Sequence, residues 1–540
     1  MKASLPPRRL IPRWRRTSAT LNLPEATYSV GKRSNLVALD TDRFERVLEE
    51  WKESPTTGLL GDLLSFSVDP SLAPAVIEVA EKALAEGFHL SPAQRLIVLS
   101  LTGEESERLV IPGALGTGVC NPAIQRQVAE IRRILSVNYA NPLVLLDLAQ
   151  FQVASGQAKR AERTVLSALS LSPYNRVIIR TLARLYVHMS KPDKAHALIK
   201  GHVLTPTDPW LMASEVSLAD LSGSSSRFAS KGFRFVRDKA ASSADLTELA
   251  GALGVSELKA GSVGRARDMF RLALTNPNDN VIAQAVTHQS SLGFHLDQPV
   301  LREAISTAQE AQLLIAWNSL RVDVAEQNAL MWHDEEPFSS RPLQFLTALY
   351  AVQKRYTEAE NLALRGLIAD PDELALLANY AYALASSGKL DAADRVLQKM
   401  LSVGHGRYDA IALATKGLVA LKRGQLALGD ALYSEAMGAF RSRKEFSFEA
   451  LCQAYYARAA QDVGHPEAHE ILLRAEALYQ KHGTSDAAIV LRQLDPSLEA
   501  PKEEEATRRL NQWVFDKKTD SLISRPGVSR PGAPPLIVKE

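Results

Sequence analysis

Apolar residues recur at helical spacing through most of the chain, and the segment 141–173 shows the pattern most clearly. Two successive stripes of apolar positions each fit one helix face, namely Leu145, Leu148 and Ala149, and then Ala161, Val165 and Ala168. Between the stripes lies Gly156, and glycine readily adopts the backbone conformation that ends a helix. Pro173 closes the segment. The pattern therefore predicts two amphipathic helices joined as a hairpin.

The hairpin pattern repeats along the chain. Equivalent apolar residues recur 34 positions apart at Leu148 and Leu182, Ala149 and Ala183, Ala161 and Ala195, Val165 and Ile199, Leu346 and Tyr380, and Ala359 and Ala393. A chain of 540 residues is too long for one compact core, and self-similarity at this period is typical of stacked helical hairpins. We therefore expect one extended array rather than a globular domain.

These repeats resemble the tetratricopeptide repeat family, whose consensus places large apolar, small, glycine and proline residues at set positions. Matching positions include Leu145, Leu148, Ala149, Gly156, Ala161, Val165, Ala168 and Pro173, then Leu346, Tyr350, Tyr356, Ala359 and Pro371, and later Gly417, Gly424, Tyr433 and Ala436. The resemblance covers residues 121–495 and is degenerate at 207–245 and 280–340. It implies an all-α fold, a right-handed α-solenoid of helical hairpins, and a non-catalytic scaffold that binds partner proteins.

The flanking segments differ in composition from the array. We expect a basic, Pro/Arg-rich extended leader at 1–35, an N-terminal helical cap region at 36–120, a C-terminal capping helix at 496–520 and a disordered tail at 521–540. In the cap region, Phe44, Val47 and Trp51 share one helix face. In the segment after Pro496, Leu510, Trp513 and Val514 are the apolar residues that could cover the other end of the array.

The resemblance also implies where partners bind. In tetratricopeptide repeats the first helix of each hairpin lines a concave face, and its inward-pointing positions map here onto Gln150, Arg180, Arg184, Arg341, Gln344 and Tyr382. Arginine and amide side chains can hold the carboxylates of a peptide through charge-assisted hydrogen bonds. The alternative is that the arginines are only solvated surface residues. We expect one or more protein partners at this groove.

The leader is the only strongly basic element. Residues 1–33 carry a net charge of +7, whereas the whole chain carries +2, so the remaining residues sum to −5. Apolar residues are interspersed among its arginines, and the residues expected to make contacts are Arg8, Arg9, Leu10, Arg13, Trp14, Arg15 and Arg16. Three interpretations follow: docking on a partner or on the chain's own array, disorder, or nucleic-acid contact, in which arginines pair with phosphates and Trp14 stacks on a base. The last would make the protein a regulator whose repeats recruit an effector, and it is the less favoured alternative.

Three segments resemble metal-binding or phosphate-binding motifs, but each is better explained as a surface or linker segment without such a site. His465 and His469 in HPEAH have metal-pair spacing, but Pro466 places His465 at the helix start rather than on the same face. The acidic run WHDEEPF at 332–338 is typical of a solvated loop, and GALGTG at 113–118 lacks the residues of a phosphate-binding loop. We therefore expect no catalytic residues, no metal site and no cofactor.

Composition bears on the compartment. Cys120 and Cys452 stand far apart and unaccompanied, so neither a disulfide framework nor a thiolate metal site is indicated. No apolar run approaches the roughly 20 residues that span a bilayer. The arginine-rich start is followed by no apolar core of a secretory signal, and its prolines oppose a transit helix. We expect a cytoplasmic protein without membrane contact.

Overall fold

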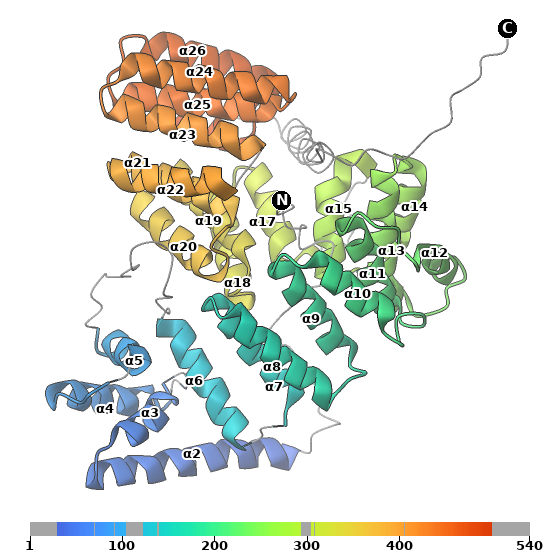
Figure 1. Ribbon diagram of the computed structural model, residues 1–540, viewed down its shortest axis with the longest axis vertical. Coiled ribbons are helices and arrows are strands. Elements are labelled where there is room, and N and C mark those ends of the chain that lie inside the picture. The colour runs from blue at the N-terminus through green and yellow to red at the C-terminus, as the bar shows by residue number, and fades with distance from the viewer. Residues whose placement is uncertain are drawn as a thin grey trace. The chain divides into compact units, whose positions relative to one another are not determined.

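The computed structural model describes residues 30–67, 69, 71–90, 92–103, 122–137, 140–292, 304–306, 308–403 and 406–498 (Figure 1). Every regular element in these ranges is a helix, so the predicted all-α fold is confirmed. The leader up to residue 29, the segment GALGTG, most of the predicted capping helix and the whole predicted tail lie outside the described residues. The described helices fall into two compact units, α2 to α21 and α22 to α27.

The first unit begins with a small cluster of helices. It comprises α2 (Val30–Glu53), α3 (Thr57–Leu64), α4 (Ala73–Ala85) and α5 (Pro92–Thr102). Phe44, Val47 and Trp51, which share the predicted face of α2, are buried in a core with Leu60 and Phe66. Thr56 sets the start of α3, because its Oγ1 accepts a hydrogen bond from the backbone N–H of Leu59 at 3.2 Å. That this cluster caps the array stays a prediction.

Helical hairpins follow in regular order. The chain runs through α6 (Pro122–Val137), α7 (Pro142–Ala154), α8 (Ala158–Leu171), α9 (Arg176–His188), α10 (Pro192–Gly201), α11 (Pro209–Leu221), α12 (Ala229–Arg237), α13 (Ser243–Lys259) and α14 (Val263–Ala273). The first helices α7, α9, α11 and α13 begin 34, 33 and 34 residues apart. The segment 207–245, where the sequence match is degenerate, therefore holds one more hairpin, α11 with α12, at the regular spacing.

The remaining helices of this unit extend the same construction. They are α15 (Asp279–Leu292), α17 (Gln309–Asn318), α18 (Val322–Glu335), α19 (Ser340–Val352), α20 (Tyr356–Ala369) and α21 (Leu374–Ser386). The second degenerate stretch, 280–340, contains α15, α17 and α18. Gly156 joins α7 to α8 with a φ of 75°, a conformation that costs a residue with a Cβ about 1–2 kcal/mol. The turn that the sequence predicts at this glycine is confirmed.

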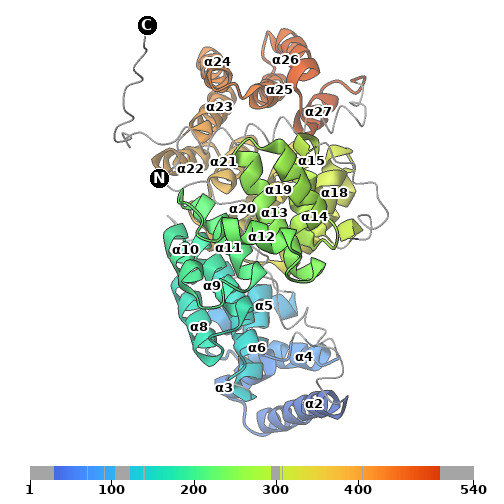
Figure 2. The same ribbon diagram turned by 90° about the vertical axis from the view of Figure 1, so that its right-hand side faces the viewer.

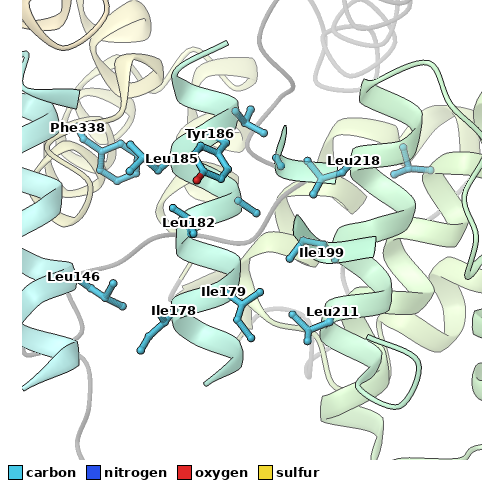
Figure 3. Close-up of a cluster of buried hydrophobic side chains, with 14 of the residues drawn as sticks. Leu146, Ile178, Ile179, Leu182, Leu185, Tyr186, Ile199, Leu211, Leu218 and Phe338 are labelled. Atoms are coloured by element: carbon cyan, nitrogen blue, oxygen red, sulfur yellow. The ribbon is translucent and has the colours of Figure 1, made fainter. Parts of the chain in front are cut away.

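Leucine, isoleucine and alanine side chains from neighbouring hairpins form the main core of the unit. Figure 3 shows Ile178, Ile179, Leu182, Leu185 and Tyr186 along α9, with Leu211 and Leu218 of α11 beside them. These side chains are buried, at 4% exposure or less. Burying a residue of this size contributes about 1.5–3 kcal/mol, so the hairpins are stable only when stacked.

The second unit repeats the hairpin construction. It comprises α22 (Leu390–Val403), α23 (Arg407–Lys422), α24 (Leu426–Ser442), α25 (Phe446–Asp462), α26 (Ala468–His482) and α27 (Ser485–Arg492). Helices α23, α24, α25 and α26 lie side by side (Figures 1 and 2). Tyr433, Phe440 and Tyr479 fill the space between them. An added Cβ at Gly417 would lie 2.8 Å from the ring of Tyr433, so α23 and α24 approach closely where the sequence pattern expects a small residue.

Candidate partner-binding face

The predicted groove residues of α7 and α9 are buried. Gln150 has no exposed surface, and Arg180 and Arg184 are 8% and 9% exposed. Arginine is almost never buried to this degree unless it is paired. Residues of the same chain that contact these side chains therefore determine whether a partner protein can reach them.

Arg180 pairs with a carboxylate from two hairpins further along the chain. Its Nη2 forms an ion pair with Glu248 of α13, and the Nδ2 of Asn278 donates a second hydrogen bond to Glu248 at 2.7 Å. The guanidinium of Arg180 also lies 4.5 Å from the ring centroid of Trp210 on α11, which is a cation–π contact. Burial lowers the pKa of Arg180, and the charge of Glu248 opposes that shift.

Arg184 lies one helical turn further on and faces the hairpins α17 to α19. Burial lowers its pKa, Arg341 lowers it further, and the carboxylates of Glu336 and Glu310 favour its charged form. Arg341 is bound in turn to Glu310 at 2.8 Å. Trp332 donates its Nε1–H to Glu336 at 3.0 Å. The result is a charged cluster shared by helices that are far apart in the sequence.

Contacts near the end of α9 show what covers this face. His188 lies 3.2 Å from the carbonyl oxygen of Ala369, 181 residues away, and its ring meets that of Phe338 edge-on at 6.3 Å. Phe338 belongs to the same buried cluster as Leu185 (Figure 3). An added Cβ at Gly156 would lie 2.9 Å from the carbonyl oxygen of Ile368. Helices α18 to α20 therefore occupy the face on which α7 and α9 carry their predicted groove residues, and partner binding there stays a prediction.

The predicted groove residues of α19 and α21 remain accessible. Arg341 and Gln344 on α19 and Tyr382 on α21 are each half-buried. Their two helices are joined by Asn379, whose Nδ2 donates to the backbone oxygen of Gln344 at 3.1 Å and to Thr347 Oγ1 at 2.8 Å. We call Arg341, Gln344, Asn379 and Tyr382 the α19–α21 stripe.

Asn379 was not among the residues expected from the sequence. It is half-buried, like its neighbours in the stripe. One signal could have found it: asparagine is a poor helix former, yet it stands in the middle of LALLANYAYALAS. Because helix propensity does not favour asparagine at this position, its presence there points to a role for its side chain in packing or binding.

Of the two segments considered for metal chemistry, the acidic run WHDEEPF is not the solvated loop that the sequence predicts, because Trp332, Glu336 and Phe338 are buried at 2% exposure or less. His465 Nε2 lies 3.3 Å from Asp430, and its Nδ1 accepts the backbone N–H of Glu467 at 3.1 Å. Burial and the nearby charge of Arg365 lower the pKa of His333 to about 4. Within the described ranges, no group of three His, Cys, Asp or Glu residues is arranged to hold a metal ion. No helix there is long and apolar enough to cross a membrane.

The leader residues predicted to make contacts are outside the described part. Arg8, Arg9, Leu10, Arg13, Trp14, Arg15 and Arg16 all precede residue 30. Docking, disorder and nucleic-acid contact therefore stay open for them, and the nucleic-acid regulator stays a prediction.

Helical hairpins, regular spacing of their first helices and turn glycines together define an all-α repeat fold of the kind that tetratricopeptide-like repeats form. No protein-family profile and no curated protein sequence matches the chain. Among solved structures, the chain is similar at 12% identity to yeast Tom70, covering 74% of this chain and 93% of that one with a TM-score of 0.29. It is also similar to the APC/C hetero-tetramer Cut9-Hcn1, at 12% identity, coverages of 81% and 98% and a TM-score of 0.19. A third similar structure is Naa15/Naa10 bound to HypK-THB, at 12% identity, coverages of 86% and 88% and a TM-score of 0.20. TM-scores this low carry no argument about function.

Proposed function

We propose that this protein is a non-catalytic interaction scaffold that binds an extended segment of a partner protein along the α19–α21 stripe. One observation carries the proposal. Gln344, Asn379 and Tyr382 are half-buried on adjacent first helices, whereas the equivalent positions on α7 and α9 are buried against the chain itself. The stripe is thus the part of the predicted groove that a partner could reach.

The side chains of the stripe suit recognition of a peptide backbone. An amide side chain offers both donors and an acceptor, so Gln344 could pair with a C=O and an N–H of an extended chain. Tyr382 adds a flat apolar surface with a polar tip, and its ring lies 6.3 Å from that of Tyr356, which limits its motion. Such a site needs no cofactor and no metal.

Arg341 adds charge at one end of the stripe. Its side chain is 23% exposed and is already bound to Glu310 at 2.8 Å. A guanidinium carries five N–H donors, so Arg341 could also bind a partner carboxylate while it keeps Glu310. We propose that partners with an acidic residue near the bound segment are preferred. Cytoplasmic location is part of the same proposal.

Affinity capture from the native host tests the stripe. The test variant is Gln344→Ala/Tyr382→Ala, and the matched control is Thr357→Ala/Asn361→Ala, two exposed residues on α20, the second helix of the same hairpin. Quantitative mass spectrometry compares the proteins that co-purify, and circular dichroism verifies that both variants are folded. We expect the test variant to lose partners that the wild type and the control retain. Equal capture by all three proteins would show that the stripe is not the binding site.

A further inference from the structure

Helix α12 and the residues beside it carry an unusual density of positive charge, so the leader is not the only strongly basic element of the chain. Five basic side chains fall between 227 and 239 with a single acid, Asp238, and they are Arg227, Lys231, Arg234, Arg237 and Lys239. All are exposed except Lys231, which is half-buried. The net charge of +4 in this segment stands out because residues 34–540 together sum to −5.

Most of these cations are not neutralised by the chain. Of these five cations, only Arg237 forms an ion pair with another residue that the structure describes, its neighbour Asp238 at 2.9 Å. The next second helix, α14, makes a useful contrast. There Arg265 pairs with Glu257 at 2.9 Å, and Arg271 pairs with Asp268 at 3.1 Å. The cations at α12 thus differ from those of α14, which are held by acidic neighbours.

The start of α12 is fixed in place by a buried carboxylate. Glu215 of α11 has no exposed surface, accepts the backbone N–H of Arg227 at 2.9 Å and lies 3.0 Å from His196 Nε2. The hydroxyl of Ser226 also donates to Glu215, and Ser226 Oγ accepts the backbone N–H of Ala229 at 3.0 Å. The loop that leads into α12 is thus held by several hydrogen bonds, so the basic face is presented in one orientation.

Aromatic rings position two of the cations and border the face. The guanidinium of Arg227 lies 5.5 Å from the centroid of the Phe228 ring, and the ammonium of Lys231 lies 6.0 Å from that of Phe235. Phe233 and Phe235 are half-buried. The basic face is therefore preorganised and has apolar surface at its edge.

We propose that the outer face of α12 is a second docking surface, which binds a short acidic segment of a partner protein that also carries aliphatic side chains. Unpaired arginines can hold carboxylates in bidentate hydrogen bonds, and the half-buried phenylalanines can receive the aliphatic side chains. A helix of nine residues is about 13 Å long, which fits a few residues of peptide. A long polyanion such as nucleic acid fits less well, because the mildly acidic remainder of the chain repels it. This surface is separate from the α19–α21 stripe.

Fluorescence anisotropy on the full chain tests the proposal, with a labelled peptide of alternating glutamate and leucine as the probe and its glutamine counterpart as the control peptide. The test variant is Arg227→Glu/Arg234→Glu, and the matched variant is Arg265→Glu/Arg271→Glu on α14. We expect the wild type to bind the glutamate peptide, with an affinity that falls as salt rises. We expect the α12 variant to bind at least about tenfold more weakly and the α14 variant to stay within about twofold of the wild type.

Two results would overturn the proposal. One is that the glutamate peptide fails to bind the wild type, or binds both variants equally. The other is that single-stranded RNA, duplex DNA or vesicles of phosphatidylcholine with about 30% phosphatidylserine show the α12 dependence while the peptide does not. Binding at the α19–α21 stripe is tested with the separate variant Gln344→Ala/Tyr382→Ala. A negative result for one proposed binding surface therefore leaves the test of the other unaffected.

Discussion

The buried ion pair between Arg180 and Glu248 gives the sharpest prediction about the array. Both side chains are less than 10% exposed, and they join α9 to α13. Replacing Arg180 by Met leaves the carboxylate of Glu248 buried, with the amide of Asn278 still donating to it at 2.7 Å. Breaking a buried pair on one side costs about 3–5 kcal/mol, since the remaining charge is uncompensated. We expect Arg180→Met to lower the free energy of unfolding by that amount.

A double-mutant cycle separates this cost from ordinary loss of packing. Glu248→Leu alone leaves a buried guanidinium and should cost about 3–5 kcal/mol, whereas Arg180→Met/Glu248→Leu removes both charges and should cost about 2 kcal/mol or less. Urea unfolding followed by circular dichroism gives the free energies. Hydrogen exchange of amides in α9 and α13 shows whether the loss is local. If the single variants cost less than about 1 kcal/mol, or if their effects simply add in the double variant, the pair does not hold these helices together.

Three further predictions concern single residues. Gly156→Ala should destabilise the protein by at least about 1 kcal/mol more than Gly261→Ala in urea unfolding, because both glycines have positive φ but only the first faces a backbone carbonyl oxygen at 2.9 Å. His333 has a pKa near 4, below the ordinary value of 6.5, so its contribution to stability is present above pH 6.5 and is lost as the pH falls toward 4. His333→Gln should therefore flatten the dependence of the urea midpoint on pH between 4 and 6.5. Burial and the charge of Glu449 raise the pKa of Cys452 to about 12, so in a Cys120→Ser background a disulfide reagent at pH 8 should modify the thiol only after unfolding.

Each of these three predictions would be contradicted by a specific result. Equal destabilisation by the two glycine variants would mean that the turn at Gly156 does not lie close to α20 in solution. An unchanged pH profile in His333→Gln would assign the dependence to other groups. Rapid modification of Cys452 in the folded protein would show that α25 is not packed as the structure has it.

The sequence predicts the hairpins well because their determinants are local. Apolar spacing, turn glycines such as Gly156 and small residues such as Gly417 act within one hairpin, and all are visible in a single period. Weak consensus at 207–245 concealed a hairpin of normal spacing, since α11 and α12 keep the helical pattern without the family's preferred residues. For these two helices, the spacing of apolar residues predicts the secondary structure better than the family consensus does.

The burial of the predicted groove residues could not be predicted from local sequence patterns. The period places Arg180 and Arg184 on one face of α9, but it does not say what meets that face. Glu248 lies 68 residues from Arg180, and the carbonyl that meets His188 lies 181 residues away. Such contacts depend on how the hairpins pack over several repeats, which local patterns do not encode. Gln344 and Tyr382 follow the same positional rule and remain accessible.

Site-specific photo-crosslinking at the α19–α21 stripe tests the central claim most directly. A photoreactive phenylalanine analogue replaces Tyr382 in the full chain in its native host, and the same analogue at Asn361 on α20 serves as the control position. We predict that a second protein becomes joined at position 382 and not at 361, and that Gln344→Ala reduces the yield of that product. No joined protein at position 382, or equal yield at both positions, would contradict the account.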